Sequence, residues 1–87
     1  MYFQDQTVTW HVYILRCGDG SFYTGVTSDP ERRLLKHNKG EGGKYTRSHL
    51  PVRLVWIEEA SNRAAAQSRE ANIKRLTHIQ KFALVCS

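Results

Sequence analysis

Cysteine is scarce in this chain and long apolar runs are absent, and each absence excludes a class of protein. Only Cys17 and Cys86 are cysteines among the 87 residues, and neither a Cys-x-x-Cys pair nor the histidine spacing of a zinc site is present. No apolar run approaches the roughly 20 residues that cross a membrane. Residues 1–9 lack the basic start and apolar stretch of a secretory signal. We therefore expect reduced, non-catalytic thiols, no membrane partner and a cytoplasmic protein, with one domain over residues 10–87 after a short N-terminal extension.

Acidic residues are in the minority, and this indicates what kind of partner the chain binds. Thirteen Lys and Arg against eight Asp and Glu give a net charge of +5. The excess gathers between residues 32 and 53, where Glu41 is the sole acid. The basic residues of this segment are Arg32, Arg33, Lys36, Lys39, Lys44, Arg47 and Arg53. A nucleic acid whose phosphates they neutralise is one interpretation, and a solvated basic surface is the other.

Two stretches rich in aromatic and β-branched residues, 10–16 and 21–26, are joined by a glycine-rich turn and predict a β-hairpin. A three-residue Gly-Asp-Gly loop would set Tyr13 opposite Gly25 and place Tyr13 and Tyr23 on one face as diagonal neighbours, about 7–8 Å apart. A two-residue loop would put the two tyrosines on opposite faces. Gly25 would leave an open place on their face, where a phosphate could approach.

A helix is expected after the hairpin. Ser28 or Asp29 is suited to cap it, and Pro30 is suited to its first turn. The pattern predicts that this helix ends near Gly40. Residues 40–43 read Gly-Glu-Gly-Gly, which predicts a mobile hinge for the basic segment, itself expected to be a loop.

The second half of the chain predicts one strand and two helices. Residues 52–58 form an apolar, β-rich run that could be buried on both faces. Ser61 is suited to cap a helix over residues 62–75, and Thr77 with Gln80 forms a capping-box pattern that begins a short last helix. The order β-β-α-β-α-α predicts a small α+β domain, with a three-stranded antiparallel sheet flanked by helices.

Three further residues are candidates for a site. Arg33 and His37 are four residues apart, so both lie on one face of the predicted helix and can point at one anion, although a solvated helix face gives the same pattern. Glu70 lies within the later helix among basic neighbours. Its carboxylate could form a salt bridge or serve as a hard oxygen ligand for Mg²⁺.

Together these residues resemble the GIY-YIG nuclease family, over about residues 10–84. Tyr13, within Val-Tyr-Ile, stands where the family has Gly-Ile-Tyr, and Tyr23-Thr24-Gly25 matches Tyr-Ile-Gly. Arg33 and His37 match the downstream Arg-x-x-x-His of the family, and Glu70 falls on its metal-binding glutamate. The segment from Gly43 to Pro51 looks like the small stand-alone, single-domain bacterial branch of the family, UPF0213.

The resemblance implies a divalent-metal-dependent endonuclease that hydrolyses phosphodiester bonds in DNA or RNA, and that selects its substrate by structure in repair or nucleic-acid processing. Glu70 would hold a single Mg²⁺ or Mn²⁺ ion, and Arg33 would neutralise the charge that grows on the phosphate. Tyr13, with a pKa lowered by nearby positive charge, would take the proton of the attacking water. Tyr23 would orient the water or the phosphate, and the roles of the tyrosines could be exchanged. His37 would hydrogen-bond the phosphate or assist the departing oxygen.

The expected contacts with the nucleic acid are Gly25, Lys44, Thr46, Arg47 and Lys74. Many family members carry an asparagine some way beyond the glutamate, and here residues 82–85 read Phe-Ala-Leu-Val instead. Two alternatives to the enzyme therefore stay open. One is a non-catalytic nucleic-acid-binding module. The other is a protein-interaction adaptor that uses this apolar segment, and a protein partner could also supply the specificity that so short a chain lacks.

Overall fold

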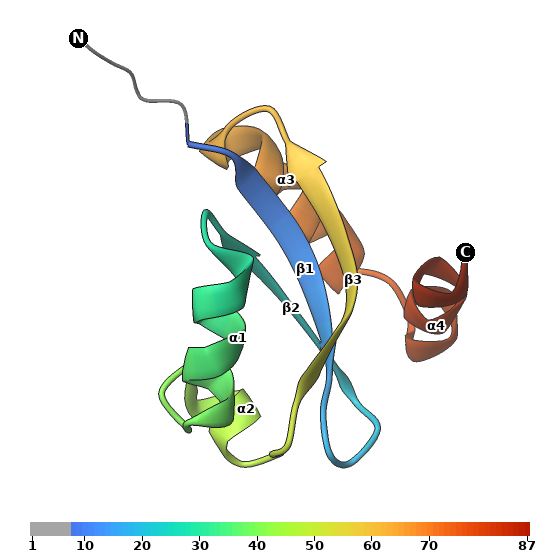
Figure 1. The fold of residues 1–87 in the computed structure, drawn as a ribbon. Helices are drawn as coiled ribbons and strands as arrows, with labels where there is room; N and C mark the ends of the chain where they lie inside the picture. The colour runs from blue at the N-terminus through green and yellow to red at the C-terminus, as the bar shows by residue number, and fades with distance from the viewer. Residues whose placement is uncertain (1–7) are drawn as a thin grey trace, which may run out of the picture.

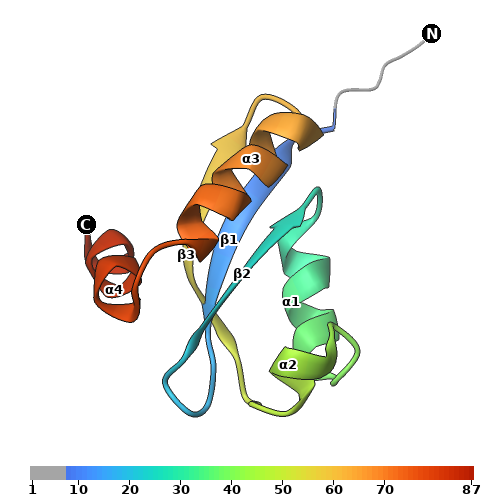
Figure 2. The ribbon, with the colours of Figure 1, turned by 180° about the vertical axis from the view of Figure 1, so that it is seen from behind.

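The computed structural model describes residues 8–87 and shows a three-stranded antiparallel sheet with helices on both faces (Figures 1 and 2). The strands are β1 (Trp10–Arg16), β2 (Phe22–Thr27) and β3 (Arg53–Ala60), in the order β2-β1-β3. The helices are α1 (Pro30–Asn38), α2 (Lys44–Arg47), α3 (Arg63–Lys74) and α4 (His78–Cys86). The predicted α+β fold is confirmed, whereas most of the predicted N-terminal extension lies outside the described residues.

The hairpin has the predicted register. The Cys17 amide donates to the Ser21 carbonyl across 2.9 Å, which closes a three-residue loop. Gly20 in this loop has φ +87°, a left-handed conformation that glycine adopts without strain. Tyr13 therefore pairs with Gly25, and the hairpin presents Tyr13 and Tyr23 on one face.

The hydrophobic core has two layers, one on each face of β1. On the face of α1 and α2, the buried cluster comprises Tyr13, Leu15, Cys17 and Val52, with Tyr23 and Leu34 packed against it. On the face of α3, the buried cluster comprises Val12, Ile14, Phe22, Ala66 and Ile73. Successive residues of a strand point to opposite faces, so the central strand contributes to both layers. The tyrosines consequently lie on the face of the sheet that α1 covers.

Helix ends follow the predicted chemistry with one correction. Asp29 caps α1 by accepting a hydrogen bond from the Arg32 amide across 3.2 Å. Thr77 and Gln80 form both hydrogen bonds of the predicted capping box at α4. The cap of α3 is Asn62 and not Ser61, because the Asn62 side chain reaches the amide three residues later, at 2.8 Å.

Two further expectations about the elements were wrong. The apolar run of β3 is not buried on both faces: β3 is an edge strand, α3 packs mainly over β1 and β2, and Leu54 and Ile57 remain exposed. The strand that is buried on both faces is β1. The basic segment after the glycines was expected to be a loop, yet Lys44–Arg47 form α2, which packs beside α1. Among the described residues no helix is long and apolar enough to cross a membrane.

Candidate active site

Two phenols and one guanidinium meet on the α1 face of the sheet. The rings of Tyr13 and Tyr23 are 6.4 Å apart between centroids, so the predicted neighbours do lie side by side. Arg33 reaches them from α1, and its Nε donates to the Tyr13 hydroxyl at 3.4 Å. Tyr13 is buried, whereas Tyr23 and Arg33 are partly exposed. Arg33 and Tyr23 are therefore the members of this set that a bound molecule can reach.

His37 occupies a different place from the predicted one. It is completely buried, with its ring between Tyr13 and Thr46. The Thr46 hydroxyl donates to the Gly43 carbonyl at 3.4 Å, so it accepts from Nδ1–H of His37 at 2.8 Å. Nε2 of His37 is then free to accept from the Tyr13 hydroxyl at 3.0 Å. A buried chain of hydrogen bonds thus connects β1, α1 and α2.

The burial of these side chains bears on two residues that were expected to contact the substrate. His37 was expected to touch the phosphate and Thr46 to contact the nucleic acid, yet both side chains are inaccessible, at 0% exposure. The reason is that α2 packs against α1 and encloses the imidazole between them. Gly42 allows this close approach, because a Cβ at that position would collide with Nδ1 of His37. Both side chains are therefore enclosed behind Tyr13, and neither reaches the surface.

The pKa of Tyr13 also differs from the lowered value that was expected from the sequence. Burial raises the pKa of Tyr13 above its ordinary value of 10.0, and the hydrogen bond from Arg33 opposes this rise without cancelling it. Burial, aided by the nearby charge of Arg33, lowers the pKa of His37 below 6.5. The pKa of Arg33 is raised, chiefly by its hydrogen bond with Tyr13. At neutral pH the site therefore contains a protonated Tyr13, a neutral His37 and a charged Arg33.

The space above Gly25 was expected to be open, but it is filled. The Tyr13 ring lies across it, and a Cβ there would collide with the phenol oxygen. The absence of a side chain at Gly25 thus makes room for the tyrosine and not for a phosphate. Gly25 is buried beneath the Tyr13 ring.

Glu70 comes to the site from α3, on the other side of the sheet. Its carboxylate is partly buried and lies 3.2 Å from Nζ of Lys74. Its charge is close enough to contribute to the raised pKa of Tyr13. Lys74 in turn lines a hollow of about 280 Å³ that runs across the free edge of β2, where side chains from both faces meet. The lining residues are Phe22, Tyr23, Thr24, Tyr45, Lys74 and Lys81.

The donor set at this edge fits one kind of metal ion. The described residues contain no group of three His, Cys, Asp or Glu side chains that could enclose an ion. Mg²⁺ does not require such a group, because it keeps several waters and binds through one or two carboxylates together with phosphate oxygens. Glu70, with its side chain 22% exposed, is suited to that role once Lys74 moves away from it.

Comparison with known proteins now adds to this geometry. Residues 9–82 match the GIY-YIG catalytic domain. The chain belongs to the GIY-YIG family. This GIY-YIG protein is 52% identical over 77 residues to a UPF0213 protein of Clostridium perfringens, covering 88% of this chain and 83% of that one. It is 47% identical over 74 residues to a UPF0213 protein of Halobacterium salinarum, with 85% and 96% covered.

A solved structure supports the fold of this GIY-YIG domain directly. The solution NMR structure of a UPF0213 protein from Bacillus halodurans is 44% identical, covers 90% of this chain and 83% of that one, and superimposes with a TM-score of 0.58. The predicted family and its UPF0213 branch are thus confirmed. The GIY-YIG domain supports a nuclease-like function that acts on nucleic acid, while the name UPF0213 specifies no activity.

The basic residues of the GIY-YIG domain surround the site on two sides. Lys44 and Arg47 are exposed on α2. A second hollow, of about 300 Å³, has as its basic lining residues Arg32, Arg33 and Lys36 of α1. One residue beside the site was missed from the sequence: Tyr45 of α2 stacks on Tyr23 at 6.3 Å between centroids. The feature of the sequence that could have pointed to Tyr45 is its place within the basic segment. Its ring faces Tyr23 only because α2, which was not predicted, turns it in that direction.

Proposed function

We propose that this protein is a divalent-metal-dependent endonuclease that hydrolyses phosphodiester bonds in DNA or RNA. The observation that carries the proposal is the convergence of Tyr13, Tyr23 and Arg33 on one face, with Glu70 of α3 paired to Lys74, which lines the hollow at the edge of β2. These are an anion-binding group, two phenols and a hard oxygen ligand within a basic surface. Phosphodiester hydrolysis is helped by an anion-binding donor and a metal ligand of this kind.

Arg33 is the residue that binds the scissile phosphate in this proposal. Its Nε is engaged with Tyr13, so the guanidinium is held in a fixed direction, and its remaining N–H groups can donate to phosphate oxygens. Negative charge grows on those oxygens as water attacks. A guanidinium already in position stabilises this charge at little reorganisation cost.

The two tyrosines take separate roles, and the structure favours one distribution. The Tyr13 hydroxyl donates to buried His37 and its pKa is raised, so we assign it to holding Arg33 in place. Tyr23 is partly exposed and lines the hollow at the β2 edge, so its hydroxyl can reach the attacking water. We therefore assign Tyr23 to orienting the water and accepting its hydrogen bond, which keeps the role first expected for Tyr23 and takes the role of general base away from Tyr13.

Glu70 would hold the single Mg²⁺ or Mn²⁺ ion in this proposal. When bound, the ion supplies Lewis-acid stabilisation of the phosphate and of the departing 3′-oxygen. Lys74 would then be released from Glu70, which leaves its ammonium free for a neighbouring phosphate. Lys44 and Arg47 would bind the backbone further along, without reading sequence. We propose that the substrate is selected by its shape, or by a protein partner, in repair or nucleic-acid processing.

The test is a cleavage assay on labelled single-stranded, duplex, flap and branched DNA and RNA, with Mg²⁺, Mn²⁺ or EDTA. Parent protein is compared with Glu70→Gln and with the matched control Glu58→Gln, whose carboxylate forms a surface ion pair with Arg69. We expect metal-dependent cutting by the parent and the control and a loss of about 100-fold or more in Glu70→Gln. Cutting that persists in Glu70→Gln would overturn the metal assignment. Binding without cutting by the parent would favour the non-catalytic module, and absence of both would favour the adaptor.

A further inference from the structure

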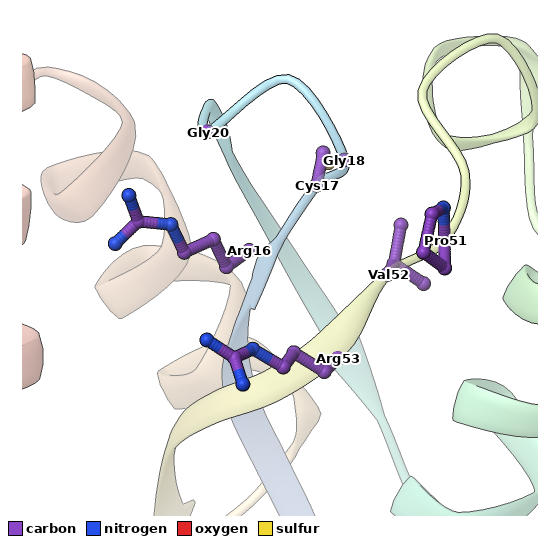
Figure 3. Close-up of a pocket in the computed structure, with 7 residues that line it drawn as sticks. All are labelled: Arg16, Cys17, Gly18, Gly20, Pro51, Val52 and Arg53. Atoms are coloured by element: carbon purple, nitrogen blue, oxygen red, sulfur yellow. The ribbon is translucent and has the colours of Figure 1, made fainter.

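A third hollow lies at the hairpin-loop end of the sheet, between residues 16–20 and the segment that leads into β3, and contains two arginines (Figure 3). Its volume is about 450 Å³, larger than either hollow beside the tyrosines. The lining residues are Arg16, Cys17, Gly18, Gly20, Pro51, Val52 and Arg53. No carboxylate is among them. The hollow is thus large enough for a small ligand and is positively charged.

The two arginines face each other across neighbouring strands. Arg16 of β1 and Arg53 of β3 are directly paired in the antiparallel register, and Figure 3 shows both side chains extending to the same side, away from Pro51. Like charges in directly opposite positions destabilise a sheet. Within residues 8–87 neither guanidinium lies within 4 Å of a carboxylate, although Arg69 and Lys74 each have such a partner. An anion between the two arginines would relieve this repulsion.

The hollow is built by the backbone around it. The Arg16 guanidinium lies 5.7 Å from the centroid of the Phe22 ring, and its Nη2 lies close to Gly20. Gly18 lets the segment before β3 approach, because a Cβ there would be 2.6 Å from the Leu50 carbonyl oxygen. The Gly18 amide donates to the His49 carbonyl at 2.7 Å, which fixes this approach. Arg16 is therefore held at the wall of a shaped hollow and does not extend freely into solvent.

We infer that Arg16 and Arg53 form a second phosphate-binding site, separate from the catalytic one. Two guanidinium forks match the oxygen geometry of a phosphate group. Arg16 is three residues beyond Tyr13 on β1, about 10 Å along the strand, and it points to the other face. The phosphate bound here is therefore not the scissile one. On the proposed function, on which this choice of ligand rests, it belongs to a second segment of the nucleic-acid substrate.

NMR titration in EDTA, where no cleavage occurs, tests the site independently of the enzyme activity. The probes are inorganic phosphate, a mononucleotide and a single-stranded oligonucleotide, and the signals are the amides of Gly18 and Gly20 and the arginine Nε–H groups. Parent protein is compared with Arg53→Gln and with the double variant Arg16→Gln, Arg53→Gln. The matched control is Arg63→Gln, because Arg63 stacks on Trp10 at the other end of the sheet.

We expect each probe to shift these signals in the parent and the control but not in the double variant. Oligonucleotide affinity should fall, and the slope of log Kd against log salt should decrease by about 0.7 for each lost contact. Shifts by phosphate and mononucleotide with unchanged oligonucleotide affinity would support the site and assign it to a free phosphate compound. No shift with any probe, or equal shifts in the double variant, would overturn it. Because Arg53 is exposed, Arg53→Gln should fold normally. This single variant therefore tests the site even if the double variant does not fold.

Discussion

Nε2 of His37 accepts a hydrogen bond from the Tyr13 hydroxyl across 3.0 Å in the interior of the protein. In the proposed mechanism this buried histidine therefore acts on the site only through Tyr13. Because Tyr13 in turn receives the Nε–H of Arg33, the direction of the guanidinium depends on a residue it does not touch. Substitutions of the side chains in this series of hydrogen bonds are expected to change stability and cleavage together.

Thr46 provides the sharpest test of this series of hydrogen bonds. Thr46→Val keeps the shape of the side chain but leaves Nδ1–H of buried His37 without an acceptor, which should cost about 1–3 kcal/mol of stability. Thr46→Ser keeps the hydroxyl and should cost less. Urea unfolding of both variants, with exposed Ser48→Ala as a control, measures the difference. Equal losses for the valine and serine variants would show that the hydroxyl does not matter.

Acid should weaken the fold through His37. The pKa of His37 is lowered below 6.5 in the folded protein, so the unfolded chain binds the proton more readily. The stability this group contributes is complete above about pH 6.5 and is lost as the pH falls through the lower folded-state pKa. The free energy of unfolding, measured from pH 7.5 down to about pH 5, should decline less in His37→Gln. Parallel declines in the two proteins would assign the effect to other groups.

Tyr13 should keep its proton throughout the neutral range. The pKa of Tyr13 is raised above 10.0 by burial, so its phenolate is not available as a base at pH 7. NMR of tyrosine labelled at Cζ, assigned with Tyr13→Phe, should show this ring titrating with a midpoint above pH 10 while the protein remains folded. Ionisation of Tyr13 below pH 10 would restore its role as the general base.

Gly25→Ala should disable cleavage although glycine performs no chemistry. The new methyl group would collide with the Tyr13 hydroxyl and displace the ring from Arg33. We expect a loss of about 100-fold in single-turnover rate and about 1–3 kcal/mol in stability. Val26→Ala, which loses stability without contact to the tyrosine, is the control. A cleavage rate for Gly25→Ala equal to that of the control would contradict the collision.

Arg33 and Arg47 should separate cleavage from binding. Arg33→Ala should reduce the single-turnover rate by about 100-fold or more with a small change in affinity, because it acts on charge that develops in the transition state. Arg47→Ala should weaken binding and reduce its salt slope by about 1, because it contacts one phosphate of the backbone. Fluorescence anisotropy and single-turnover kinetics measure the two effects. Equal losses of both quantities in both variants would contradict this division.

Much of the fold could be predicted because its signals are local. The glycines of the hairpin loop fix the register that brings Tyr13 and Tyr23 to one face, and Thr77 with Gln80 caps α4. The burial of β3 could not be predicted in the same way. An apolar run predicts a strand, but whether that strand is central or at the edge depends on pairing between segments that are distant in sequence.

The sequence predicted that Tyr13, Tyr23, Arg33 and His37 lie close together, but not how deeply each is buried. The spacing of Arg33 and His37 places both on one face of α1, yet one is partly exposed and the other is completely buried. That difference is caused by α2, a four-residue helix too short to give a periodic signal. The close approaches at Gly25 and Gly42 involve residues that are distant in sequence, so a sequence pattern does not contain them.

The order in which β1, β2, α1 and α3 follow one another has a consequence during synthesis. A chain emerging from the ribosome presents the hairpin, Arg33 and the basic helix α2 well before α3 brings Glu70 to the edge of β2. In the proposed mechanism, an unfinished protein can therefore adhere to nearby RNA or DNA but cannot cut it. The ability to cut arises only when translation has passed α3 and folding has joined the two faces of the sheet.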